Sequence, residues 1–154
     1  MSEQVQEGQA APDFTLPATG GNQVTLSQYQ GKKVVLYFYS KDNTSGCTDE
    51  AREFRDMYEA ITAAGAVILG VSKDSLETHE KFSAKHELPF LLLSDTDRVV
   101  CQLYGVFKEK NMYGKKVMGI ERSTFIINEQ GKITRVFRKV KVAGHAQAVL
   151  AALK

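Results

Sequence analysis

Hydrophobic residues occur along the chain in two patterns, as short unbroken runs and as stretches with a period of about 3.6 residues. The unbroken runs are rich in β-branched and aromatic residues, which is typical of strands buried on both faces of a sheet. They predict strands at Val34–Tyr39, Ala66–Ser72, Phe90–Leu93, Ser123–Asn128 and Lys132–Val140. A short strand ending the segment Gly8–Leu16 and a returning arm at Gln23–Leu26 predict a hairpin near the N-terminus.

The stretches with the helical period lie between and after these strands. They predict helices from Thr48 to a stop at Gly65, at Ser75–His86, through Val99–Tyr104 and at Ala143–Leu153. The candidates for the N-caps of the first three helices are Thr44 or Ser45, Asp74 or Ser75, and Asp95 or Thr96. The polar segment Lys108–Gly119 contains two glycines, so we expect a loop or a loose hairpin there.

Strands and helices alternate along most of the chain, which predicts an α/β fold. We expect a central mixed β-sheet flanked by helices, with an N-terminal hairpin extension. The last two strands are joined by residues 129–131, which end in a glycine, and should form an antiparallel pair. No repeat and no linker divides the sequence, so residues 1–154 are expected to form a single domain.

Composition and charge exclude several classes of protein. Hydrophobic residues make up 43% of the chain and charged residues 25%, which is typical of a soluble globular protein. Twenty Lys and Arg against 18 Asp and Glu give a net charge of +2, too small to indicate a nucleic acid or membrane partner. The polar segment Met1–Gln9 does not resemble a signal peptide, and two cysteines without such a signal predict free thiols in the cytoplasm. Two Cys and three scattered His form no zinc-binding pattern, so no metal is expected.

Cys47 is the candidate reactive residue. It follows the polar segment Ser40–Gly46 and stands at the predicted start of a helix. Free backbone N–H groups and the positive end of the helix dipole favour a thiolate there, and the thiolate is the nucleophilic form of cysteine. The alternative from position alone is a buried structural cysteine, because free cysteines are among the most buried residues.

The segment Tyr37–Ala51 (YFYSKDNTSGCTDEA) resembles the active-site segment of peroxiredoxins, in particular the bacterioferritin comigratory protein (PrxQ-type) branch. Further segments similar to that branch, in the family's order, are Ala11–Leu16, Leu92–Asp95, Lys110–Asn128 and Lys141–His145. The resemblance implies a thioredoxin-like fold and a thiol peroxidase that reduces hydrogen peroxide and organic hydroperoxides. It also implies no metal or organic cofactor, thioredoxin or another small thiol as the reductant, and a monomer.

The family pattern assigns roles to four residues of this chain. By resemblance, Cys47 is the peroxidatic cysteine, Thr44 the hydroxyl residue three positions before it, Arg122 the distant arginine and Glu50 a supporting acid. Thiolate attack on a peroxide requires a sulfur with a low pKa and donors that stabilise charge on the leaving oxygen. Taken singly, the residues have plainer interpretations: a helix cap for Thr44, a solvated charge for Arg122 and a first-turn acid for Glu50.

The chain departs from the family pattern in the active-site segment and at the resolving position. Ser40 and Ser45 replace usual prolines, which predicts a less rigid loop. Branch members carry a resolving cysteine at positions that correspond to Arg52 or Ser83. Either this is a natural one-cysteine enzyme reduced by an external thiol, or Ser83 is an engineered Cys-to-Ser change that holds the reduced form. Cys101, with apolar helical neighbours, is expected to be packed and inert rather than resolving.

Two other functions remain open from the sequence. A thioredoxin-like disulfide reductase needs C-x-x-C, but the segment that ends at Cys47 begins with Thr44 and has only the second sulfur. A redox sensor would share the first oxidation step with a peroxidase and stop after one equivalent of peroxide. The lysines of segment 108–116 are expected to be solvated, and all three histidines are expected to be surface residues: His79, His86 and His145.

Overall fold

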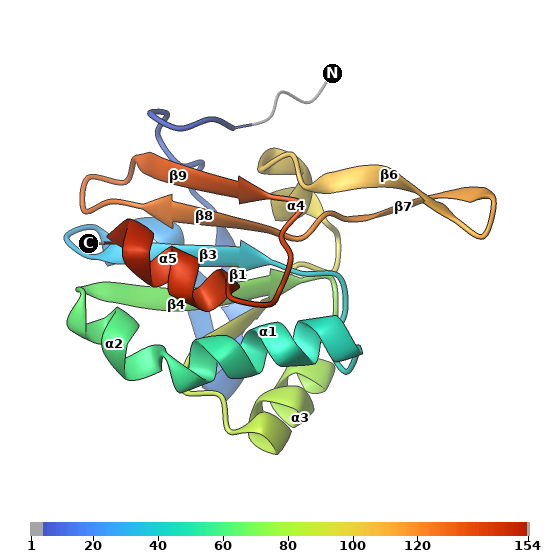
Figure 1. Cartoon of the computed structure of the whole chain (residues 1–154), viewed down its shortest axis with the longest axis horizontal. Coiled ribbons are helices and arrows are strands. Elements are labelled where there is room, and N and C mark those ends of the chain that lie inside the picture. The colour runs from blue at the N-terminus through green and yellow to red at the C-terminus, as the bar shows by residue number, and fades with distance from the viewer. Residues whose placement is uncertain (1–4, 154) are drawn as a thin grey trace.

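The computed structural model describes residues 5–153, and Figure 1 shows a central sheet with α1, α2 and α5 on its near side. The strands are β1 (Thr15–Ala18), β2 (Asn22–Thr25), β3 (Lys33–Phe38), β4 (Ala66–Ser72), β5 (Leu91–Ser94), β6 (Phe107–Met112), β7 (Lys115–Ile120), β8 (Ser123–Ile127) and β9 (Ile133–Arg138). The helices are α1 (Ser45–Asp56), α2 (Tyr58–Ala63), α3 (Leu76–His86), α4 (Val99–Leu103) and α5 (His145–Leu153). Short 3-10 turns lie at Thr19–Gly21 and Leu26–Tyr29.

Seven strands form one mixed sheet in the order β2-β1-β5-β4-β3-β8-β9. β3 and β5 both run parallel to β4, whereas β8 is antiparallel to β3, and β9 to β8. The N-terminal hairpin of β1 and β2 extends the sheet beyond β5. This topology confirms the predicted mixed sheet with a terminal antiparallel pair and an N-terminal hairpin extension.

Strand β3 is buried on both faces, as its unbroken apolar run predicted. Alternate residues of a strand point to opposite faces, so Val34, Leu36 and Phe38 join one hydrophobic cluster and Val35 and Tyr37 join another. The second cluster packs the sheet against α1, α2 and α5. The carboxyl end of β3 is thereby fixed in the centre of the molecule, and the chain leaves it directly for α1.

Two predicted helix boundaries are wrong. The first helix begins at Ser45, with the predicted candidate Thr44 at its N-cap position, but it does not run unbroken to Gly65. It is interrupted at Met57, whose dihedral angles (φ −103°, ψ 9°) separate α1 from α2. The change of direction there keeps both Phe54 and Ile61 fully buried. Arg98, in a left-handed conformation, occupies the N-cap position of α4 that the sequence assigned to an earlier residue. Ser75 is confirmed as the N-cap of α3, because its hydroxyl accepts a hydrogen bond from the Thr78 backbone N–H.

The segment 107–120 forms a hairpin, which confirms one of its two predicted conformations. Figure 1 shows β6 and β7 projecting away from the main sheet. Tyr113, Val117 and Met118 are exposed along it, whereas Phe107 and Ile120 pack against the core at its base. Within residues 5–153, no helix is long and apolar enough to span a bilayer.

The expectation that the histidines are surface residues is wrong for His79 and His145. His79 is fully buried, and only 6% of His145 is exposed, whereas His86 is partly exposed. The His145 Nε2 lies 2.8 Å from the Thr124 hydroxyl, and the ring packs edge-on against Phe54 and Phe137. Burial, with a smaller effect of the nearby Arg122 charge, lowers the pKa of His145 to about 4.

We predict that His145 makes the protein less stable in mild acid. Its pKa is about 4 in the folded chain and about 6.5 when exposed, so over this interval the unfolded chain binds the additional proton. The free energy of unfolding should therefore fall as pH falls from 6.5 to 4. In His145→Gln, denaturant unfolding measured across this range should show a shallower decline. An unchanged slope would contradict the assignment.

Candidate active site

Cys47 lies in the first turn of α1. Residues 40–46, which lead from the end of β3 into that turn, are hereafter called the active-site loop. Thr44 occupies the N-cap position with extended dihedral angles, but its side chain makes no capping hydrogen bond. Backbone N–H groups in a first helical turn lack partners within the helix, so the local field favours a negative charge on the sulfur. Only 2% of Cys47 is exposed, so the thiol is covered except to a small reactant.

Arg122, which directly precedes β8, contacts Cys47. It precedes Ser123, which is paired with Phe38, so the antiparallel register of β8 and β3 places it beside the end of β3. Its Nη2 donates a hydrogen bond to the Cys47 Sγ at 3.2 Å. A methyl group at Gly46 would lie 3.3 Å from the same Nη2, so the absence of a side chain there allows this close approach.

Glu50 fixes the other nitrogen of the same guanidinium. Nη1 of Arg122 donates to Oε1 of Glu50 at 2.6 Å, and only 1% of the Glu50 side chain is exposed. Glu50 lies three residues after Cys47 in α1, so the two side chains share a helix face and contact one cation. Because Ser45 is the first helical residue, Glu50 is in the second turn, and the interpretation as a first-turn acid is wrong.

Burial and charge act in opposite directions on the ionisable groups of this site. Burial raises the pKa of the Cys47 thiol, but the nearby Thr44 side chain, the Lys41 backbone and the Arg122 guanidinium together hold it below its ordinary value. Burial raises the pKa of Glu50 to about 7 against the opposing effect of Arg122. The Thr44 hydroxyl proton points to the Lys41 carbonyl in the structure, at 2.8 Å, so we assign the guanidinium as the principal donor to the thiolate.

Ser40 contributes a contact that sequence reasoning missed. Its hydroxyl oxygen lies 3.7 Å from the Cys47 Sγ, within hydrogen-bond range for sulfur. The sequence indicated only that Ser40 loosens the loop by replacing a proline. A proline has no hydroxyl, so this contact belongs to the serine, and its presence in the stretch before Cys47 was the only available signal.

The remaining predicted residues lie apart from this group. Ser83 is in α3, partly exposed. Cys101 is in α4, fully buried, and its backbone N–H donates to Asp95 at 2.8 Å. Burial, reinforced by the Asp95 carboxylate, raises the pKa of Cys101 far above its usual range. Both cysteines are free thiols, and the expectation that Cys101 is packed is confirmed.

The model of the AhpC/TSA family matches residues 7–136 of the chain. Peroxiredoxin Bcp of Xanthomonas campestris pv. campestris is 51% identical over 100% of this chain and 97% of that protein. A putative peroxiredoxin bcp of Coxiella burnetii is 52% identical over 97% of this chain and 99% of that protein.

Solved structures extend the likeness to three dimensions. A structure of X. campestris bacterioferritin comigratory protein, from work on its alkyl peroxide reduction activity, superposes with a TM-score of 0.87 at 51% identity, covering 91% of this chain and 89% of that chain. Peroxidoxin BcpB of Mycobacterium tuberculosis gives 0.86 at 32% identity, with 97% of each chain covered. These matches confirm the expected thioredoxin-like fold.

We predict that Cys101 does not react in the folded protein, because its thiol is buried and this burial strongly disfavours the thiolate. A thiol alkylating reagent at neutral pH should label Cys47, and should label Cys101 only after denaturant is added. Peptide mass spectrometry identifies the labelled residue. After one equivalent of peroxide, an intramolecular Cys47–Cys101 disulfide would contradict the prediction.

Proposed function

The chain belongs to the AhpC/TSA family, in its group of Bcp or PrxQ peroxiredoxins, and we propose that Cys47 is its peroxidatic cysteine. As a member of this group, the protein is a thiol peroxidase, an oxidoreductase that works through such a cysteine. The observation that carries the assignment is the 3.2 Å hydrogen bond from the Arg122 guanidinium to the Cys47 sulfur at the start of α1. We assign Arg122 and Thr44 as further catalytic residues and Glu50 as a supporting residue.

The first chemical step is attack of the Cys47 thiolate on the terminal oxygen of a hydroperoxide. A sulfur–oxygen bond forms as the oxygen–oxygen bond breaks, which leaves a sulfenic acid and an alkoxide, or hydroxide when the substrate is hydrogen peroxide. The leaving oxygen takes up a proton to give the alcohol or water. X. campestris bacterioferritin comigratory protein was studied for alkyl peroxide reduction, which supports organic hydroperoxides as substrates here.

Arg122 serves both the attacking and the leaving atoms. Its Nη2 favours the thiolate before attack, and the same donor can follow the negative charge as it moves to the leaving oxygen. The Glu50 carboxyl holds the planar guanidinium at its other nitrogen, so that the cation does not have to reorient during the reaction. Glu50 and Cys47 raise the pKa of Arg122 against the effect of its burial, so the guanidinium stays charged.

Thr44 is suited to hold the substrate. Its hydroxyl proton is directed to the Lys41 carbonyl, so its oxygen lone pairs are available to accept a hydrogen bond from the peroxide. A peroxide held in this way has its oxygen–oxygen bond aligned with the sulfur, which is the geometry that displacement requires. The exposed position of Thr44 gives the substrate access from solvent.

For the second half of the cycle we propose an external thiol reductant, thioredoxin or another small thiol. The sulfenic acid condenses with one thiol to a mixed disulfide and releases water, and a second thiol then restores Cys47. Ser83 cannot resolve the sulfenic acid because it has no sulfur. We further propose that residues 1–154 act as one peroxiredoxin domain, as a cytoplasmic monomer without a metal or organic cofactor.

We predict that Arg122→Ala slows oxidation of Cys47 by hydrogen peroxide by about a hundredfold, the scale for loss of one transition-state donor. Stopped-flow measurement of the oxidation rate tests this, with Cys47→Ser as the variant that should consume no peroxide. With a thiol reductant present, the wild type should consume many equivalents of peroxide. A single equivalent would indicate a sensor instead, and an unchanged rate in Arg122→Ala would refute the role of the arginine.

We predict that Ser83→Cys gains turnover with thioredoxin. The introduced thiol can condense with the Cys47 sulfenic acid to form an intramolecular disulfide, the substrate that thioredoxin reduces. Peroxide consumption coupled to thioredoxin oxidation should rise, while the rate of Cys47 oxidation stays at the wild-type value. Equal thioredoxin-dependent turnover in both proteins would show that position 83 has no part in resolution.

A further inference from the structure

Asp42 is the single inward anchor of the active-site loop. Among residues 40–46 it alone is buried, with 2% of its surface exposed, whereas Lys41, Asn43 and Thr44 are exposed. Asn43 has a left-handed conformation (φ 70°), which turns the chain immediately after this anchor. The path from β3 to Cys47 is therefore fixed to the rest of the protein through Asp42.

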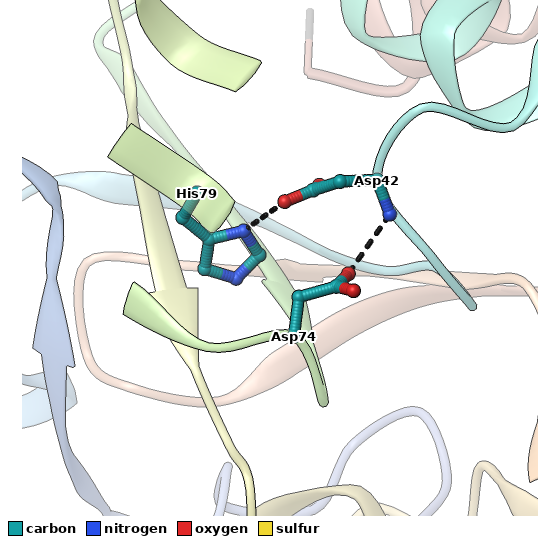
Figure 2. Close-up of side chains that lie close together, drawn as sticks. All are labelled: Asp42, Asp74 and His79. Atoms are coloured by element: carbon teal, nitrogen blue, oxygen red, sulfur yellow. Dashed lines mark hydrogen bonds and ion pairs between the residues drawn. The ribbon is translucent and has the colours of Figure 1, made fainter. Parts of the chain in front are cut away.

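Three groups bind Asp42. The Tyr39 hydroxyl donates to its Oδ1 at 2.5 Å, and its Oδ2 lies 2.6 Å from the His79 Nδ1. Its backbone N–H donates to the Asp74 Oδ2 at 2.8 Å. Figure 2 shows Asp42 joined to both His79 and Asp74, with the histidine presented by α3. A carboxylate buried with this many donors is held in one position.

Both ring nitrogens of His79 take part in hydrogen bonds. The His79 Nε2 lies 2.9 Å from the Leu93 carbonyl oxygen, which can only accept, so Nε2 carries a hydrogen. The Asp42 carboxyl accepts from Tyr39 at one oxygen and shares a proton with the His79 Nδ1 at the other. Asp42, Asp74 and His79 therefore form a hydrogen-bonded network in this structure.

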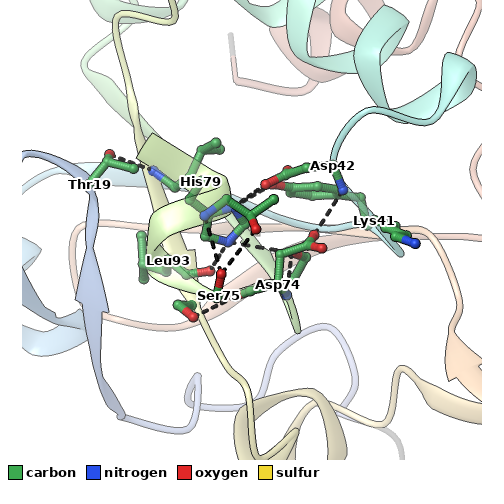
Figure 3. Close-up of polar contacts among 12 residues, drawn as sticks. Thr19, Lys41, Asp42, Asp74, Ser75, His79 and Leu93 are labelled. Atoms are coloured by element: carbon green, nitrogen blue, oxygen red, sulfur yellow. Dashed lines mark hydrogen bonds and ion pairs between the residues drawn. The ribbon is translucent and has the colours of Figure 1, made fainter. Parts of the chain in front are cut away.

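The network connects the active-site loop to three other elements. Asp74 Oδ2 also accepts from the Ser72 hydroxyl at the end of β4, and the Ser94 hydroxyl at the end of β5 donates to the Asp74 carbonyl. Figure 3 shows polar contacts gathered around His79 and Asp74, with Lys41 on the active-site loop nearby. Asp42 and His79 are 2% and 0% exposed, so the contact between them is shielded from solvent.

We propose that the Asp42–His79 pair is a positioning element of the peroxidase site, which holds the active-site loop so that Cys47 stays within reach of Arg122. The inference rests on the proposed role of Cys47. The sulfur depends on two separate supports: Arg122 comes from the β8 side, and the loop is anchored to α3 on the other side. The Lys41 carbonyl that orients Thr44 directly precedes Asp42, so loss of the anchor displaces Thr44 and the first turn of α1 together.

Substitution of the pair should weaken Cys47 reactivity. We expect Asp42→Ala and His79→Leu each to slow oxidation by hydrogen peroxide by about ten- to a hundredfold, the scale for a misplaced reacting atom. Each should also move the thiolate titration of Cys47, followed by ultraviolet absorbance, to higher pH. Since the two residues act as one unit, the double variant should oxidise no more slowly than the slower single variant.

Milder variants keep the test valid if these proteins fold poorly. Tyr39→Phe removes the hydroxyl that donates to Asp42 and lies 3.4 Å from the His79 Nδ1, but keeps the contact between Asp42 and His79, so it should shift the rate and titration in the same direction by less. Asp42→Asn should restore most of the rate lost in Asp42→Ala, because an amide can accept from Tyr39 and donate to the Nδ1 of a neutral His79. The matched control is Ser75→Ala, which removes the N-cap of the same helix α3 without touching the pair. It should lower the unfolding temperature and retain the oxidation rate.

Three results would overturn the proposal. One is a set of single variants with lower unfolding temperatures but wild-type oxidation rates and thiolate titrations, which would make the pair purely structural. Another is a double variant whose loss equals the product of the single losses. The third is an equal loss of rate in Ser75→Ala, which would indicate general loosening of α3. Activity in Cys47→Ser would instead refute the proposed function, and the thiolate titration would still test the pair.

Discussion

A buried thiolate needs a permanent positive charge beside it, and the structure around Cys47 satisfies this constraint. Water that would solvate the anion is largely excluded, so burial alone favours the neutral thiol. The Arg122 guanidinium, 3.2 Å from the sulfur, offsets that effect. The antiparallel pairing of β8 with β3 delivers the arginine to the right end of the sheet, and a glycine at position 46 leaves room for it.

The site consequently combines a rigid scaffold with a short polar loop. β3 ends in the middle of the sheet and α1 begins seven residues later, so the Cys47 sulfur lies where a buried strand gives way to a helix N-terminus. The ionisable groups there are paired internally: Arg122 with Glu50 and Cys47, and Asp42 with His79. Paired charges can be kept at low exposure without the cost of an isolated buried ion. Desolvation strengthens the same interactions that prepare the sulfur for reaction.

The sequence predicted what depends on local pattern and missed what depends on distant partners. The apolar runs of β3, β4 and β8 were sufficient to locate the strands, and the family resemblance singled out Cys47 and Arg122. The burial of His79 was not predictable from its helix, because its partners are Asp42, 37 residues earlier, and a carbonyl of β5. The contact of Ser40 with the sulfur and the break between α1 and α2 also depend on packing that no short segment encodes.

The hairpin of β6 and β7 lies outside the main sheet that the other strands form. It forms its own two-stranded sheet, and its residues near the main body, Phe107 and Ile120, supply its contacts with the core. Its tip at Tyr113 is fully exposed. Lengthening such a loop adds little conformational cost, so this tip is a suitable point for attaching a fluorophore or inserting a peptide tag. A reporter placed there would lie at the far end of the hairpin from Ile120, the end at which the chain continues to Arg122.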